Sequence, residues 1–101
     1  MSVKKLKPVH PGVILKHDFL EPLELSAYRL AIELGVSRPT VSQIVGGDRS
    51  ITADMALRLS RYFGTSAEVW LNLQAQHDLD VALNRIGHTV SRQIQPRVMP
   101  A

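Results

Sequence analysis

Residues 26–50, SAYRLAIELGVSRPTVSQIVGGDRS, end one short helix and begin another almost at once. Leu30 and Leu34 have helical spacing, and Gly35 follows them. Glycine readily takes the left-handed conformation that ends many helices. Ser37, two residues later, is a residue type that caps helix N-termini. Two short helices joined by such a tight turn form a helix-turn-helix, which holds the two helices at a fixed angle.

The second helix of this pair would bury Val41 and Ile44 and turn its polar side chains outward. Such a helix fits the major groove of DNA, which is about 12 Å wide. Arg can pair bidentately with guanine there, and Gln with adenine. The candidate base contacts are Arg38, Thr40, Ser42 and Gln43. The alternative is a helical hairpin in a bundle whose polar residues form only a solvated face, and spacing by itself leaves both open.

The rest of the chain also has helical patterns, and no segment shows sustained alternation of apolar and polar residues. Pro11 suits the first turn of a helix that Pro22 closes. Thr52 and Ser66 are candidate N-caps of two further helices, the last over residues 67–87. We therefore predict an all-α fold of five helices with a long C-terminal helix. Its expected parts are a flexible basic arm at 1–9, a helix-turn-helix domain with a dimerisation helix at 10–87, and a mostly irregular tail at 88–101.

Composition excludes several classes of protein. The 101 residues suggest one domain, and none of them is cysteine. Disulfides and thiolate metal sites are therefore excluded, which fits a reducing cytoplasm. No apolar run approaches the roughly 20 residues of a membrane span, so no membrane partner is expected. The formal charge of +3 and the pI of about 9.7 are compatible with nucleic-acid binding.

The sequence offers little for metal, cofactor or catalytic chemistry. Its 4 histidines are scattered and lack the spacing of a metal site. His10 is expected to cap or precede the first helix. No nucleophile elbow or glycine-rich phosphate loop occurs. We therefore expect no metal, no cofactor and no enzymatic activity.

Longer stretches of the sequence resemble a known family. The helix-turn-helix segment is similar to that of lambdoid phage repressors, the XRE family, at Leu30-Ala31, Gly35-Val36-Ser37 and Val41-Ser42-Gln43-Ile44. A larger part of the chain resembles the HigA-type, or VapI-like, antitoxins of bacterial toxin–antitoxin modules. The most specific stretches are HPG at 10–12, SAYRLA at 26–31, RSITAD at 49–54, FGTS at 63–66 and WLNLQ at 70–74. The resemblance implies a lambda-repressor-like DNA-binding fold, a homodimer on a palindromic operator, repression of its own operon and neutralisation of a RelE-like RNase toxin.

The resemblance also implies roles for single residues. Two positions depart from the phage-repressor pattern: Pro39 replaces a polar base-reading residue, and Ala27 stands where a phosphate-binding Gln is common. Alanine cannot donate that hydrogen bond, so its neighbours would have to supply it. The family's base-reading positions fall on Arg38, Pro39, Ser42 and Gln43. The expected DNA-backbone contacts are Ser26, Tyr28, Arg29, Ser37, Gly46, Arg49 and Ser50.

The last predicted helix has apolar residues on two sides. Val69, Trp70 and Leu73 fit one face, which we expect to pack on the domain core. A second stripe follows helical spacing through Leu71, Ala75, Leu79, Ala82 and Ile86. A helix that is apolar on two sides needs two burial surfaces, and a symmetric partner is an economical second one. We therefore expect this stripe to form a homodimer interface, unless the small core covers both faces.

An antitoxin of this kind also needs a surface for its toxin. RelE-like toxins bind RNA and are basic, so acidic residues outside the DNA face are candidates. Asp18, Glu21 and Glu24 lie at the end of the first helix and are the expected toxin contact, unless they are only a solvated face. Two other functions stay open: an XRE-family regulator without a toxin, and a helical adaptor that does not bind DNA.

Overall fold

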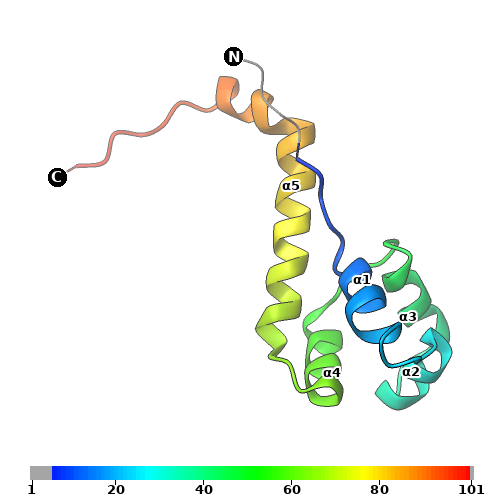
Figure 1. Cartoon of the computed structure of the whole chain (residues 1–101). Coiled ribbons are helices and arrows are strands. Elements are labelled where there is room, and N and C mark those ends of the chain that lie inside the picture. The colour runs from blue at the N-terminus through cyan, green and yellow to red at the C-terminus, as the bar shows by residue number, and fades with distance from the viewer. Residues whose placement is uncertain (1–5, 101) are drawn as a thin grey trace.

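The computed structural model describes residues 6–100 and is all-α over that range (Figure 1). The prediction of five helices is confirmed, because α1 and η1 follow one another without a break. The η1 segment is π-helical, with the backbone N–H of Glu21 donating to the carbonyl of Lys16 at 2.9 Å. The helical segments are α1 (Pro11–Ile14), η1 (Leu15–Leu20), α2 (Ala27–Leu34), α3 (Arg38–Val45), α4 (Ala53–Phe63) and α5 (Ala67–Gln93).

Helix starts and stops follow the predicted capping residues. The Oγ of Ser26 accepts from the backbone N–H of Arg29 at 3.0 Å, and Ser37, Thr52 and Ser66 cap α3, α4 and α5 in the same way. Gly35, at φ 69°, ends α2 in the left-handed conformation that glycine adopts without strain. The tight turn between α2 and α3 is therefore set by local chemistry.

One hydrophobic core joins all five helices. Leu15, Leu30, Ile44, Leu59 and Trp70 are fully buried in it. The packing role predicted for the indole of Trp70 is confirmed, and its Nε1–H donates to the Oγ1 of Thr65 at 2.8 Å. The same prediction was wrong for Val69. Its side chain is 46% exposed, because the face of α5 that contacts the core is centred on Trp70 and Gln74.

Helix α5 is longer than predicted. It continues to Gln93, so residues 88–93 of the expected irregular tail are helical. Val90 follows Ile86 by one helical turn and continues the apolar stripe, which a mostly irregular tail would have interrupted. Figure 1 shows α5 rising well beyond the other helices, with its last turns bent from its axis and the tail leading away as extended chain.

The N-terminal segment is anchored where the structure describes it, while residues 1–5 of the expected arm lie outside the described range. The backbone N–H of Leu6 donates to the Oδ1 of Asn84 at 2.9 Å, and the Nδ2 of Asn84 donates to the Leu6 carbonyl at 2.8 Å. The segment therefore runs beside α5 (Figure 1). No sequence pattern indicated this pairing across the length of the chain.

Candidate nucleic-acid interface

The exposed face of α3 carries the predicted base-contacting residues. Val41 and Ile44 are fully buried beneath it, whereas Arg38, Ser42 and Gln43 are exposed and Thr40 is half-buried. The hydroxyl of Ser42 donates to the carbonyl of Pro39 at 3.3 Å within its own helix. Ser42 can therefore offer its oxygen to DNA only as an acceptor while that bond is kept.

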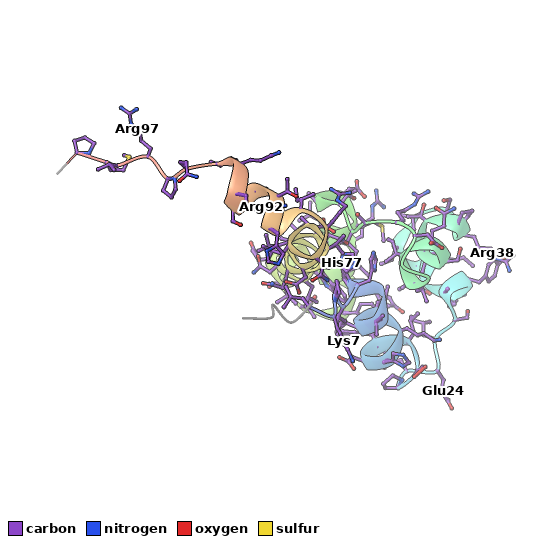
Figure 2. The ribbon with its side chains drawn as sticks, turned by 90° about the horizontal axis from the view of Figure 1, so that it is seen from above. Lys7, Glu24, Arg38, His77, Arg92 and Arg97 are labelled. Atoms are coloured by element: carbon purple, nitrogen blue, oxygen red, sulfur yellow. The ribbon has the colours of Figure 1, made fainter. Side chains whose placement is uncertain are left out.

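Arg38 is held in place by an aromatic ring. Its guanidinium carbon lies 4.9 Å from the centroid of the Tyr28 ring on α2. Such a cation–π contact orients the guanidinium and leaves its edge N–H groups free to donate. Within residues 6–100 Arg38 has no ion pair. Figure 2 shows its side chain projecting from the end of the molecule farthest from the tail.

Arg49, which follows α3, lies over the same face. Its Nε–H donates to the Oε1 of Gln43 at 2.9 Å, and its Nη1–H donates to the Oγ1 of Thr40 at 3.3 Å. Thr40 in turn shares a hydrogen bond of 2.7 Å with the Oγ of Ser37. Four predicted DNA contacts from α3 and its flanks thus form one polar network, a pairing that spacing along the sequence did not reveal.

The loop that carries Arg49 is fixed from α5. The side chain of Gln74 is buried between Ile51 and Asp78. Its Oε1 accepts from the backbone N–H of Ile51 at 2.8 Å, and its Nε2 donates to the Oδ1 of Asp78 at 3.0 Å. A glutamine one turn after Trp70, on the core-facing side of α5, was the only signal for this role.

His10 supports the loop from the other side and caps α1, as predicted. Its Nδ1 accepts from the backbone N–H of Gly12 at 2.9 Å, and its ring packs edge-on against that of His77, with centroids 5.0 Å apart. Burial, and after it the nearby charge of His77, lowers the pKa of His10. A hydrogen bond to the backbone of Arg49 and the carboxylates of Asp78 and Asp48 act in the opposite direction. The lowered pKa favours neutral His10, the form in which its Nδ1 can accept.

This pKa predicts that the protein loses stability in mild acid. The unfolded chain takes up the proton near pH 6.5, before the folded one, so stability should decline as the pH falls from about 6.5 through the lowered pKa of His10. We expect the melting temperature to fall between pH 7.5 and 5.5. His10→Asn keeps a capping acceptor that does not titrate, and it should melt as the parent does at pH 7.5 and lose less stability at pH 5.5. Equal losses in both proteins would contradict this role.

The remaining predicted backbone contacts lie at the edges of this face. Ser26 and Tyr28 are at the start of α2, where Ser26 already caps the helix. Arg29 forms an ion pair with Glu33, with 2.6 Å between Nη2 and Oε1. Gly46 and Ser50 are exposed in the loop after α3. Ser26, Tyr28 and Arg29 thus come before α3 in the chain, and Gly46 and Ser50 come after it.

The predicted dimer stripe is exposed along α5. The alternative of a core that covers both faces is excluded, because Leu71, Leu79 and Ile86 are 37%, 54% and 41% exposed. Ala75 is exposed and Ala82 half-buried. The C-terminal half of the stripe forms a nearly apolar groove of about 270 Å³. It is lined by Leu79, Ala82, Leu83, Ile86, Gly87, Val90 and Ser91, of which Leu83, Gly87, Val90 and Ser91 were not predicted.

The three predicted toxin-contacting acids surround the end of η1. Asp18 is exposed on η1, Glu21 is exposed directly after its last residue, and Glu24 lies in the following turn with the unusual φ of 51°. Leu23 between them is 60% exposed. In Figure 2, Glu24 projects from a different edge of the molecule than Arg38. The acids therefore leave the α3 face uncovered.

The described residues 6–100 contain neither a metal site nor a membrane-spanning helix. No group of three or more His, Cys, Asp or Glu side chains there could hold a metal ion. Across the same range, every helix is too short or too polar to cross a membrane.

Comparison with known proteins places this chain in a family. A helix-turn-helix family model matches residues 17–70. Virulence-associated protein I of Dichelobacter nodosus is 49% identical over 78 residues, which cover 77% of this chain and 72% of that protein. The chain belongs to the XRE-type helix-turn-helix family. Members of this family are DNA-binding antitoxins and regulators, not enzymes.

Within this family, the chain is similar to HigA antitoxins. Antitoxin HigA-1 of Vibrio cholerae is 40% identical over 85 residues, which cover 84% of this chain and 80% of that antitoxin. The structure of Pseudomonas aeruginosa antitoxin HigA with the higBA promoter is 46% identical and superposes with a TM-score of 0.89. It matches 91% of this chain and 100% of that one. The predicted HigA-type fold is therefore confirmed.

Proposed function

We propose that this protein is the antitoxin of a toxin–antitoxin module, that it neutralises a RelE-like RNase toxin and that it represses its own operon from a palindromic operator in the cytoplasm. The observation that carries the DNA-binding part is the α3 face, where Arg38 is exposed, aligned by Tyr28 and without an ion pair in the described range. A merely solvated face would not need an aromatic ring to align a cation. The HigA relatives support the antitoxin role.

The proposed functional unit is a homodimer joined through α5. The apolar groove between Leu79 and Val90 is exposed in one protomer, and a second copy of the same groove would cover it in a symmetric contact. Two α3 helices related by that symmetry match two halves of an inverted repeat. The dimer thus explains both the uncovered face of α5 and the palindromic target.

The proposed toxin surface is the end of η1 and the turn after it. Glu21 and Glu24 line a groove of about 390 Å³ together with Lys16 and apolar side chains that include Leu20 and Val45. Leu23 adds an exposed apolar side chain beside them. Carboxylates would attract a basic toxin, and the exposed apolar side chain would supply contact area once it is docked.

The test combines footprinting with toxin rescue. The protein should protect an inverted repeat in its own promoter, with half-sites about one helical turn apart or a multiple of it. Co-expression should restore growth of cells that produce the proposed toxin, which we expect to be a small basic protein encoded beside this gene. Reversal of Asp18, Glu21 and Glu24 to Lys should abolish rescue and leave the footprint in place, because none of the three is a proposed DNA contact. A promoter without a protected repeat would refute autorepression, and rescue by the reversed variant would refute this toxin surface.

A further inference from the structure

The side-chain oxygens of Ser37, Thr40 and Gln43 on the α3 face already accept hydrogen bonds within the protein. The Oε1 of Gln43 accepts from Arg49, as does the Oγ1 of Thr40. The Oγ of Ser37 accepts from the backbone N–H of Thr40 at 3.4 Å and shares a hydrogen bond with its hydroxyl. The orientation of the Gln43 amide follows from its partner, because the Nε–H of Arg49 can only donate.

What this network leaves free is mainly donors. The two bonds made by Arg49 leave three of its five guanidinium N–H groups. The amide of Gln43 keeps both hydrogens on Nε2. Whichever hydroxyl donates between Ser37 and Thr40, the other keeps its hydrogen. The cluster of Ser37, Thr40, Gln43 and Arg49 therefore offers mostly N–H and O–H groups to a partner.

Such a donor cluster fits one base edge best. In the major groove guanine presents two acceptors, N7 and O6, whereas adenine presents one acceptor and one donor. Bidentate pairing of Gln43 with adenine would use its Oε1, where one of two lone pairs already accepts from the guanidinium of Arg49. We propose that Arg49 and Gln43 act as one unit that reads a guanine in each operator half-site, so that Arg49 determines base specificity. This inference rests on the proposed operator binding and replaces the expected pairing of Gln43 with adenine and of Arg49 with phosphate.

The fork of the guanidinium distinguishes this role from a phosphate contact. Arg49 uses Nε and Nη1 together to hold Gln43 and Thr40, a geometry that a lysine ammonium cannot reproduce. A phosphate contact needs mainly positive charge, which lysine supplies. Arg49→Lys therefore keeps the charge and removes the fork. Arg29→Lys is the matched control, because Arg29 is a proposed phosphate contact on α2 outside the cluster.

The experiment measures the affinity of each variant for the operator and for every single base-pair substitution in a half-site. The affinity of the parent should fall by about 10-fold or more when one particular G·C pair is substituted. Replacement of that guanine by 7-deazaguanine, which lacks only the N7 acceptor, should also weaken binding by the parent. Arg49→Lys and Gln43→Ala should both lose discrimination at that pair, and their combination should add little to either. Arg29→Lys should keep the base profile of the parent.

Two results would overturn the proposal. One is an unchanged base profile in Arg49→Lys, with only the overall affinity or its salt dependence altered, which would make Arg49 a phosphate contact. The other is a loss of discrimination in Arg49→Lys at an A·T pair and not at a G·C pair. In both cases specific binding by the parent would leave the proposed function standing, whereas a parent without specific binding would refute both. Melting curves of the exposed variants should match the parent and so separate specificity from folding.

Discussion

Leu79→Asp and Ile86→Asp should each convert the protein from a dimer to a monomer in light scattering. Both side chains lie in the apolar groove of α5 and are largely exposed in one protomer, so a carboxylate there costs the folded monomer little. In a symmetric contact the same carboxylate would be buried among apolar side chains without a partner. Since linked binding sites gain avidity, operator affinity should fall by about 10²–10⁴-fold when the two α3 helices are separated.

Val81→Asp is the matched control for this pair. Val81 is on the same helix and is 40% exposed, but residues two apart in a helix point in nearly opposite directions, so it lies away from Leu79. This variant should remain dimeric and keep the affinity of the parent for the operator. If the groove variants also stay dimeric while the helical circular dichroism signal is unchanged, α5 is not the interface.

The sequence was sufficient for those parts of the fold that depend on neighbouring residues. Ser26, Gly35 and Ser37 define the helix-turn-helix through hydrogen bonds and backbone angles that span only a few residues. The apolar spacing of α3 likewise predicted which face would be buried. Capping hydrogen bonds and glycine backbone angles depend on residues close in sequence, so they can be predicted without the tertiary structure.

Contacts between distant segments could not be predicted in this way. Asn84 holds Leu6 across most of the chain, and Gln74 holds the loop at Ile51. A single polar side chain can pair with any backbone group that the fold brings near, so its partner cannot be inferred from sequence alone. The same applies to Arg49, whose hydrogen bond to Gln43 could not be inferred from its position after α3.

The extent of α5 was underestimated for a related reason. Thr89 and Val90 are β-branched and favour extended chain when taken alone. In the structure they continue a helix that is already formed, and each added residue then gains a hydrogen bond without a new nucleation step. The helical spacing of Val90 after Ile86 was the sequence feature that favoured a longer helix.

At Gly12 the backbone of α1 lies directly against that of α3, and this contact helps to set the position of α3. Gly12 is buried, and a Cβ atom there would overlap the carbonyl oxygen of Ile44 and lie 2.8 Å from its carbonyl carbon. Both are backbone atoms near the end of α3, so no side-chain rotation can relieve the overlap. The helices would have to separate, which would open the core around Leu15 and Ile44.

Gly12→Ala should therefore destabilise the protein by about 3 kcal/mol or more, in the upper range for overpacked cores. For a domain of this size the melting temperature should fall by on the order of 15 °C, measured by circular dichroism or calorimetry. Gly46→Ala is the control at the C-terminus of α3. Its φ is −78°, and the nearest atom to an added Cβ is the Oδ2 of Asp48 at 3.3 Å, on a side chain that can rotate away. That variant should stay within about 0.5 kcal/mol of the parent. A Gly12→Ala protein that melts with the parent would show that α1 does not rest on the backbone of α3, and the placement of the recognition helix would have to be revised with it.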